Sequence, residues 1–521
     1  MKELRVLFDD SNGIYLVYEK SKIANKYVIL GKDDTFNDII LKETKENIVY
    51  LKSDEVKGLV ALGVEYIVTD DKTKKDVVID RTNCHIRGIN AYKILKVSAI
   101  NSYKGITLSY ASNTIYDKYY IYEKIDDKYN KILETEDFQI NSKLFKEGNT
   151  YYIEAYSKDE EGNYILKAKT LDYECSITDY EYNNIDPKVA VVIPAYNASK
   201  QLARTIDSII FSSLKDLEVV IVNDGSKDNT YEIMTWYKNK YPNLLKIVDK
   251  PNEGQAKTRY KALNFVNAKY TFYMDADDMV HPEMLSKMYE CIVSEDADFV
   301  MNKVVAREKF DDYSIFFKHI DDKNNPTRSI VKTYEQFIMD KHNGSYESFY
   351  LVTLWHQLGK TELYKAHPMP HFNNYEDIAY IRTIASYGNK FAFQMDSYYV
   401  WDKRVGTYFT STSKESERKD STEKKSRMYV DAIFYFVNDC NKDRIHYLYY
   451  DALKDLRGFV NPTLEAVRKG NKYNNDNIYI EESYKYLKMY DVLDMPLVKD
   501  DEELCKIVQD IIMLKENYYD D

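Results

Sequence analysis

The chain has 521 residues, of which 44% are hydrophobic and 30% are charged, so its composition is that of a folded protein rather than of a disordered polymer. Its 73 lysines and arginines and its 85 aspartates and glutamates give a net charge of −12, which argues against nonspecific binding to nucleic acid or anionic lipid. At roughly 150 residues per domain, this length predicts about three or four domains.

Cysteines and apolar segments indicate the cellular compartment. The five cysteines lie far apart and form no Cys-x-x-Cys pair, so neither a disulfide framework nor a zinc site is expected. The first ten residues contain no apolar segment of the kind found in a signal peptide, and no apolar run approaches the length of about 18 residues that a membrane span needs. We therefore predict a cytoplasmic protein, and leave open a peripheral contact with the inner face of the membrane.

The first 176 residues contain short segments of β-type sequence separated by turn residues. They predict a β-rich N-terminal module over residues 1–88 and a β-sandwich module over residues 89–176. Through the segment Thr150–Ser157 and the hairpin that follows it, the second module resembles a fibronectin type III domain. Two roles remain open for these modules, namely a spacer or packing unit and a sugar-binding unit.

After Pro187, strand and helix patterns alternate, which predicts a doubly wound α/β domain with a mostly parallel sheet over residues 187–410. The expected strands are continuously apolar, as in a parallel sheet that is covered on both faces. The expected strands are Val189–Ile193, Leu217–Val222, Leu244–Val248 and Tyr270–Met274, and the expected helices are Ser199–Leu214, Thr230–Lys240 and Ala256–Asn267.

The region 415–521 is predicted to be helical, with amphipathic segments at Met428–Val437, Tyr447–Val460 and Leu504–Ile512. These helices are open to three roles: an interface between copies of the chain in a homo-oligomer, a contact with a membrane surface, or a platform for an acceptor.

Polar groups follow each of the four expected strands of the α/β domain. The segments are Pro194-Ala-Tyr-Asn197, Asn223-Asp-Gly-Ser226, Pro251–Arg259 and Asp275-Ala-Asp-Asp278. Ligands of open α/β sheets bind beyond the carboxyl ends of the strands, so we expect these four segments to form one binding rim.

Asp275 and Asp277 are two positions apart, directly after a buried strand. Two carboxylates held together repel each other unless a cation lies between them. Mn²⁺ or Mg²⁺, which prefer oxygen ligands, would relieve this repulsion and keep positions open for a diphosphate. The alternative is that the segment only caps the helix that begins near Pro282.

Three other groups of the rim suit a nucleotide. The carboxylate of Asp224 can accept hydrogen bonds from a base N–H or a ribose hydroxyl, and Tyr196 offers an aromatic face to a nucleobase. Lys257 and Arg259 lie near the start of a helix, where backbone N–H groups and cations together favour a phosphate. The alternatives are an ordinary Asp-Gly turn, core packing of the tyrosine, and a solvated basic face.

The motifs Val191-Val-Ile-Pro-Ala-Tyr-Asn197, Val222-Asn-Asp-Gly-Ser-Lys-Asp-Asn-Thr230 and Met274-Asp-Ala-Asp-Asp278 resemble, in this order and spacing, those of family 2 glycosyltransferases of the GT-A fold. The stretch Gly254-Gln-Ala-Lys-Thr-Arg259 is similar to one in enzymes that build bacterial cell-surface glycans, including wall teichoic acid GlcNAc transferases. The resemblance implies a UDP-sugar donor, a metal held by Asp277 with Asp275, and uridine held by Pro194, Tyr196, Asp224 and Arg259. The donor-binding residues expected are Pro194, Tyr196, Asn197, Asp224, Gly254, Lys257, Arg259, Asp275 and Arg404.

The same resemblance assigns the catalytic pair Glu376-Asp377, with Asp377 as the general base and Glu376 as a contact to sugar hydroxyls. An acidic pair favoured by a helix N-terminus is the alternative. Relatives often carry a metal-binding His in a later loop, where this chain has Tyr408. In that loop Arg404 is expected to contact the diphosphate, unless it is only part of the loop surface.

The predicted function is therefore a metal-dependent, inverting transfer of a hexose or N-acetylhexosamine from a UDP-sugar to a glycan or glycoconjugate acceptor. Such a displacement needs a base for the acceptor hydroxyl and a cation for the leaving diphosphate. Two alternatives remain open. One is a catalytically inactive, glycan-binding scaffold, and the other is a nucleotidyltransferase, which would usually carry a Gly-rich basic loop after its first strand.

Overall fold

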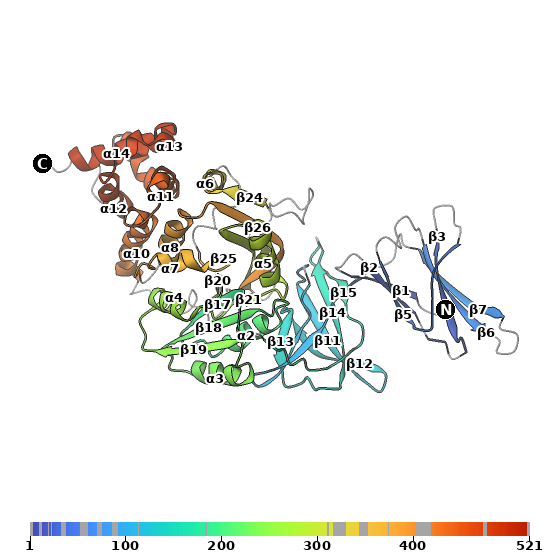
Figure 1. Cartoon of the computed structure of the whole chain (residues 1–521). Coiled ribbons are helices and arrows are strands. Elements are labelled where there is room, and N and C mark those ends of the chain that lie inside the picture. The colour runs from blue at the N-terminus through green and yellow to red at the C-terminus, as the bar shows by residue number, and fades with distance from the viewer. Residues whose placement is uncertain are drawn as a thin grey trace. The chain divides into compact units, whose positions relative to one another are not determined.

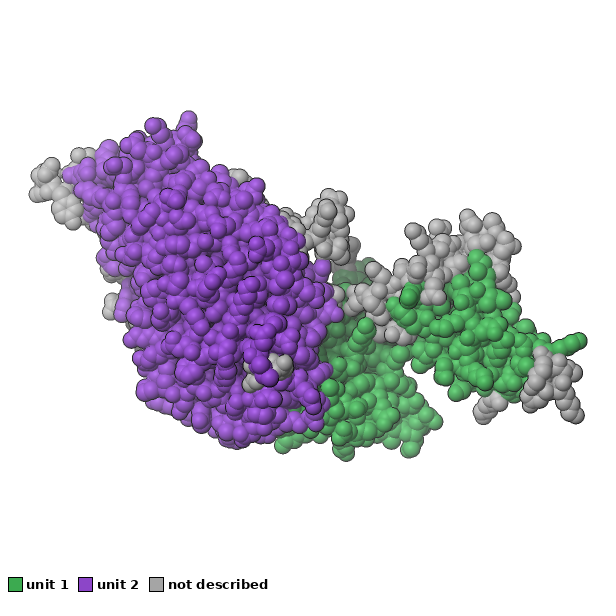
Figure 2. Space-filling view, in the orientation of Figure 1, with its two compact units in different colours: residues 1–178 green, residues 179–521 purple. Residues whose placement is uncertain are grey.

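The computed structural model describes most of the chain and divides it into two compact units, residues 1–178 and residues 179–521 (Figure 2). The described residues are 4–9, 13–18, 20–21, 23–32, 38–52, 61–69, 75–85, 92–112, 114–159, 161–182, 185–309, 312–315, 330–342, 353–372, 375–402, 418–472 and 477–517.

The first unit contains three sheets (Figure 1). A four-stranded antiparallel sheet is formed by β3 (Lys26–Lys32), β4 (Asp38–Thr44), β6 (Ala61–Thr69) and β7 (Asp76–His85). A three-stranded sheet is formed by β9 (Ser98–Ser102), β10 (Gly105–Ser109) and β13 (Gln139–Ser142). A nine-stranded sheet is formed by β1 (Leu4–Asp9), β2 (Gly13–Tyr18), β5 (Ile48–Lys52), β8 (Tyr92–Ile94), β11 (Lys118–Ile125), β12 (Lys128–Thr135), β14 (Thr150–Lys158), β15 (Tyr164–Lys169) and β16 (Tyr173–Glu174).

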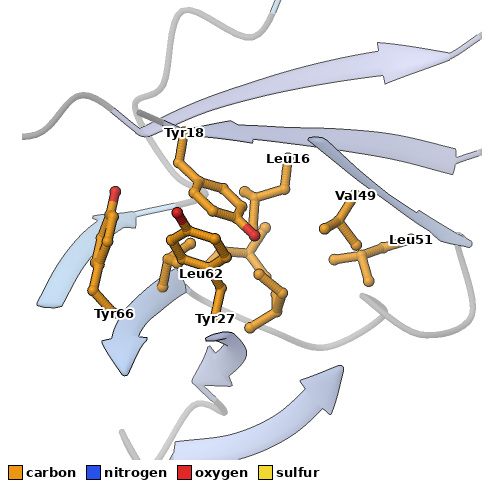
Figure 3. Packing of buried hydrophobic residues seen from close by; sticks show 9 residues of the cluster. Leu16, Tyr18, Tyr27, Val49, Leu51, Leu62 and Tyr66 are labelled. Atoms are coloured by element: carbon orange, nitrogen blue, oxygen red, sulfur yellow. The ribbon is translucent and has the colours of Figure 1, made fainter. Parts of the chain in front are cut away.

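Two of these sheets share a core in the N-terminal part of the unit. Leu16 and Tyr18 of β2 and Leu51 of β5 pack with Tyr27 of β3 and Tyr66 of β6 (Figure 3). The rings of Tyr18 and Tyr27 meet edge to face with their centroids 5.0 Å apart, an arrangement that aromatic pairs favour. The strands at this core pair antiparallel within each sheet, β2 with β5 and β3 with β6, and the shared core supports the predicted sandwich-like architecture.

One sheet contains strands from both predicted β modules. The short strand β8 pairs in parallel with β1 on one side and with β15 on the other. Along β14, the buried residues Tyr151, Ile153 and Ala155 alternate with partly exposed ones, as in an antiparallel strand with one face in the core.

The second unit is built on a ten-stranded sheet with the order β19-β18-β17-β20-β25-β22-β26-β21, to which β23 and β24 are added. Its strands are β17 (Val189–Ala195), β18 (Leu217–Asp224), β19 (Leu245–Lys250), β20 (Tyr270–Tyr273), β21 (Met279–Val280), β22 (Phe299–Lys309), β23 (Asp312–Ile315), β24 (Ile330–Thr333), β25 (Gln357–Lys360) and β26 (Lys390–Asp402).

The sheet of the second unit is mixed, which corrects the expectation of a mostly parallel sheet. The four strands predicted from the sequence, β17 to β20, are parallel to one another. The chain then returns through β25, which is antiparallel to both β20 and β22. The parallel prediction was therefore right for the part of the sheet that carries the strand-end motifs. It was wrong for most of the part beyond β20, where β22 and β26 are parallel but β21, β23, β24 and β25 pair antiparallel with their neighbours.

Helices follow the predicted strands closely. Among the described residues before 418, the helices are α2 (Leu202–Ile210), α3 (Thr230–Lys240), α4 (Gln255–Ala262), α5 (Met284–Ser294), α6 (Tyr334–His342), α7 (Thr361–Ala366) and α8 (Glu376–Ala385), with a 3-10 turn η1 (Leu263–Phe265). The first and third predicted helices are shorter than expected: α2 covers only Leu202–Ile210 of Ser199–Leu214, and α4 ends at Ala262 and passes into η1.

The C-terminal region is helical as predicted, and its helices gather in one group (red in Figure 1). They are α10 (Arg418–Ile433), α11 (Ile445–Arg468), α12 (Ile478–Leu487), α13 (Pro496–Lys499) and α14 (Glu502–Asn517), with 3-10 turns η4 (Tyr435–Val437), η5 (Lys442–Arg444) and η6 (Val492–Asp494). Within the part of the chain that the structure describes, no helix combines the length and the apolar character that crossing a membrane requires.

Candidate active site

The carboxylate of Asp224 ends the fully buried strand β18 and holds the following loop. It accepts hydrogen bonds from the backbone N–H of Glu253 (2.9 Å) and of Gly254 (3.0 Å), and it forms an ion pair with Lys250. Burial raises the pKa of Asp224, but these contacts outweigh burial and hold it below the ordinary value. Asp224 is 4% exposed and connects β18 to the loop before α4.

The end of β17 presents one open aromatic ring. Pro194 is partly buried, whereas Tyr196 is 50% exposed, so that its ring is available to a ligand. Asn197 adopts a left-handed φ of 51° and pairs with the loop after β18: its N–H donates to Ser226 Oγ (3.0 Å) and its Oδ1 accepts from Lys227 N–H (2.8 Å). Asn197 therefore fixes the two strand ends relative to each other.

The start of α4 combines a glycine with an unpaired cation. Gly254 caps the helix with a φ of +88°, a conformation that glycine adopts readily. Lys257, in the first turn, is partly buried and makes no hydrogen bond or ion pair to another described residue. A helix N-terminus with such a cation suits a phosphate.

Arg259 of α4 lies between the acidic segment after β20 and the start of α8. Its Nη2 donates to Asp275 Oδ1 (2.7 Å) and its Nη1 donates to Glu376 Oε1 (2.8 Å). The side chain is 2% exposed, and although burial opposes its charge, the two carboxylates hold the pKa of Arg259 above its ordinary value. Three predicted site residues from three separate segments thus meet in one buried ion network.

Asp377 follows Glu376 in the first turn of α8. Burial, Glu376 and Asp275 raise the pKa of Asp377 to about 7, while Arg259 acts in the opposite direction. The residue before this pair, Tyr375, has a left-handed φ of 65°, which is uncommon for a tyrosine and turns the chain sharply into the helix. A carboxylate with a pKa near neutrality can accept a proton at physiological pH.

Asp277 is surrounded by acidic groups. Burial and the neighbouring Asp275 raise the pKa of Asp277 to about 7, and Asp402 adds to this effect. Arg204 opposes it, donating to the backbone carbonyl of Asp277 (2.9 Å) and pairing with Asp402 Oδ2 (2.6 Å). Asp275 therefore raises the pKa of both Asp277 and Asp377. The predicted metal ligand and the predicted base are both within the electrostatic influence of the same carboxylate.

Asp278 has a structural role that sequence reasoning missed. Its Oδ2 accepts from the Tyr399 hydroxyl (2.5 Å) and its Oδ1 from the backbone N–H of Asp402 (2.9 Å), both in β26. Tyr399 also accepts a hydrogen bond from the backbone N–H of Asp275 (3.3 Å). These contacts hold the acidic segment against the end of β26. In the sequence, the presence of a third aspartate in the motif was the only local feature that could have suggested this role.

Strand β26 ends beside the acidic segment, because its last residue, Asp402, contacts both Asp278 and Arg204. The predicted residues Arg404 and Tyr408 lie outside the described residues.

A second cluster of ionisable groups lies elsewhere in this unit. Within the described residues, His342, Asp451 and Asp455 are the one group of three or more potential metal ligands whose ligand atoms lie within 4.8 Å of one another. Lys341 and Arg382 already form ion pairs with both aspartates, so the cluster is neutralised by protein cations and does not fit a metal ion.

The part of the chain that carries most of these residues is similar in sequence to known proteins. Residues 190–355 match the model of glycosyl transferase family 2. The glycosyltransferase GlyA of Streptococcus pneumoniae serotype 4 is 28% identical over 183 residues, which cover 35% of this chain and 25% of that protein. The cholesterol galactosyltransferase of Borreliella burgdorferi is 28% identical over 235 residues, which cover 43% of this chain and 63% of that protein. The chain thus spans a quarter to about two thirds of the length of these relatives.

A crystal structure of TarS residues 1–349 from S. aureus in complex with UDP-GlcNAc has 18% sequence identity and a TM-score of 0.44, covering 64% of this chain and 92% of that one. The family model confirms the resemblance seen in the strand-end motifs: residues 190–355 are a glycosyltransferase domain of family 2.

Proposed function

We propose that this chain is a metal-dependent, inverting glycosyltransferase of the GT-A fold that moves a hexose or N-acetylhexosamine from a UDP-sugar to a hydroxyl of a surface glycan or glycoconjugate. The observation that carries the proposal is the position of Arg259 between Asp275 and Glu376. It joins the donor-binding strand ends to the helix that bears Asp377.

The donor would bind along the rim formed by β17, β18 and α4. Tyr196 offers an open ring to the uracil base, and the partly buried Lys257 supplies a positive charge at the first turn of α4 for the diphosphate. Asp224 shapes the loop that carries Gly254, and Arg259 orients Asp275 toward the ribose or the donor sugar.

Asp377 would act as the general base for the acceptor hydroxyl. Its pKa of about 7 lets it take up a proton at physiological pH, and Glu376, held by Arg259, lies beside it to bind a sugar hydroxyl. One base and one displacement at the anomeric carbon give inversion. Two catalytic carboxylates that flank the bond are instead the arrangement of glycoside hydrolases.

The acidic groups around Asp277 fit Mn²⁺ or Mg²⁺. Asp275 and Asp402 both raise the pKa of Asp277. The cations that pair with these carboxylates are already engaged: Arg204 with Asp402 and a backbone carbonyl, and Arg259 with Asp275 and Glu376. A divalent ion with oxygen ligands would lower this repulsion and, when bound, would stabilise charge on the leaving diphosphate. Asp277 and Asp275 would hold it, and Arg404 would contact the diphosphate.

The setting of the enzyme is also proposed. We divide the chain into a β-rich module (1–88), a β-sandwich module (89–176), the catalytic domain (187–410) and the helical region (415–521). We place the enzyme in the cytoplasm, with access to the inner face of the membrane where surface glycans are assembled, and suggest that copies of the chain associate through the C-terminal helices.

Slow hydrolysis of the donor tests this function without knowledge of the acceptor. The full chain is incubated with a panel of UDP- and GDP-sugars in the presence of Mn²⁺ or a chelator, and the released nucleoside diphosphate is measured. We expect release from at least one UDP-sugar with Mn²⁺ and little with the chelator. Absence of binding and turnover with every UDP-sugar would contradict the proposal, as would equal turnover with and without metal.

A further inference from the structure

Helix α8, which carries Asp377 in its first turn, is held at both ends by buried arginine ion pairs. At its start, Glu376 is paired with Arg259 of α4. In its last turn, Arg382 is 1% exposed and reaches into the C-terminal helices. The first contact belongs to the donor site, whereas the second lies outside it.

The second network joins four helices, α6, α8, α10 and α11. Nη2 of Arg382 contacts Asp451 Oδ2 (3.2 Å) and forms an ion pair with Asp455, both on α11, and its Nη1 donates to the backbone carbonyl of Ile433 (3.3 Å). Lys341 of α6 contacts Asp451 Oδ1 (2.6 Å) and Asp455 Oδ2 (3.2 Å). The neighbouring His342 places Nε2 2.6 Å from Asp451 Oδ1.

The charges of this network balance only when α6, α8 and α11 keep their positions. Asp451 is fully buried, and Lys341 and Arg382 are almost fully so. Two cations face two carboxylates, so a displacement of α8 relative to α11 would leave buried charges unpaired, which is costly. The network therefore favours a single register between α8 and the C-terminal helices.

We propose that the C-terminal helical region positions the catalytic carboxylate: Asp451 and Asp455, acting through Arg382, fix α8 and thereby the location of Asp377. This inference rests on the proposed function. Arg382 follows Asp377 by five positions, about 7.5 Å along a helix, so a shift of the last turn reaches the first turn within one rigid element. A misplacement of reacting groups by about 1 Å can cost about 100-fold in rate.

The test uses the full chain and replaces Asp455, the more exposed of the two aspartates with 19% side-chain exposure. In Asp455→Asn, we expect kcat to fall about tenfold or more while the KM for the UDP-sugar changes by less than about twofold. The donor site is formed mainly by β17, β18 and α4, which this variant does not touch. Asp455→Glu keeps the charge and should restore most of the rate.

The matched control breaks an ion pair of the same helix on the protein surface. Arg457 of α11 contacts Glu503 of α14 (2.7 Å), and both side chains are more than two fifths exposed. Arg457→Met should leave kcat and KM unchanged, because an exposed pair contributes little to the position of α11. Circular dichroism and calorimetric titration with UDP measure the folded, binding-competent fraction of each variant.

A second variant, Arg382→Lys, keeps the positive charge but lacks the guanidinium that contacts two carboxylates at once. If Asp455→Asn does not fold, kcat and KM are measured on Arg382→Lys instead. A selective fall of kcat in the folded variants supports the inference. The inference is overturned if kcat, divided by the number of UDP-binding sites that calorimetry measures, is the same in the variants and the wild type. In that case any loss of activity only reflects a loss of folded protein. A wild-type chain without donor turnover overturns the proposed function and this inference with it, whereas an active wild type with unaffected variants overturns the inference alone.

Discussion

Arg259 donates a hydrogen bond to Glu376 across 2.8 Å, although the two residues are 117 positions apart in the chain. The contact is buried, and the same guanidinium also holds Asp275. The helix that bears the predicted base is thereby fastened to the segment that bears the predicted metal ligands.

Replacing the proposed base should stop transfer without weakening donor binding. In Asp377→Asn, the amide cannot accept the proton, so we expect a loss of about 100- to 10,000-fold in transfer rate. The affinity for UDP, measured by calorimetry, should be within about threefold of wild type. Asp500→Asn, at an exposed position in the C-terminal region, serves as the control. Full transfer by Asp377→Asn would remove the mechanism.

The buried arginine should be important for stability. Arg259→Met leaves the buried carboxylate of Glu376 unpaired, which typically costs about 3–5 kcal/mol. The double variant Arg259→Met/Glu376→Gln should be less destabilised than the two single effects added together, because the unpaired charge is removed. All three tryptophans, Trp236, Trp355 and Trp401, lie in residues 179–521, so tryptophan fluorescence during urea denaturation reports on this unit. Strict additivity of the two changes would contradict the contact.

The rate of transfer should depend on pH through Asp377. Because burial and neighbouring carboxylates raise its pKa to about 7, the base is protonated and inactive below that pH, and activity should rise between about pH 6 and pH 8. Glu376→Gln removes a negative neighbour and should move this rise to lower pH. Glu290→Gln, an exposed substitution on α5, should not move it. A shift to higher pH in Glu376→Gln would show that another group controls the rate.

Removal of the metal should weaken binding of the nucleotide itself. We expect calorimetry to show at least about 100-fold lower affinity for UDP in chelator than in Mn²⁺. Asp277→Asn should lose most of this difference, because replacing even a residue that only supports a metal ligand typically lowers metal affinity by about 10- to 100-fold. Asp500→Asn should keep the full metal effect. Equal UDP affinity with Mn²⁺ and with chelator would place the divalent ion outside the donor site.

Two glycines offer a matched pair of substitutions. A Cβ on Gly225 would lie 2.8 Å from the backbone nitrogen of Asn252, and its φ of +71° disfavours other residues. We expect Gly225→Ala to destabilise the unit by at least about 1–2 kcal/mol and to lower UDP affinity, since the affected loop is held by Asp224. Gly458, inside α11, has open space around its Cβ position, and Gly458→Ala should instead stabilise by about 1 kcal/mol. Similar effects of both changes would contradict the tight turn at Gly225.

The β17 to β20 region was predictable because its signals are local. Apolar runs and helical periodicity identified β17 and β18 with their helices, and the polar residues at each strand end identified the rim. The long amphipathic patterns of α11 and α14 were likewise sufficient to predict helices. Beyond β20, strands such as β22 and β26 were not predicted, and with them the mixed character of the sheet was missed.

The sequence by itself determined the order of strands and helices in the donor-binding half, the chemistry of the strand-end residues and the family of the domain, because these depend on residues close together in the chain. The tertiary structure alone decided that Arg259 joins Asp275 to Glu376, that Asp278 fastens the acidic segment to β26, and that Arg382 anchors α8 to α11. Such contacts join buried charged or polar groups that are distant in sequence. Which groups pair is decided in the folded core, where every buried charge and polar group needs a partner. The residues next to such a group in the sequence do not indicate which distant residue that partner is.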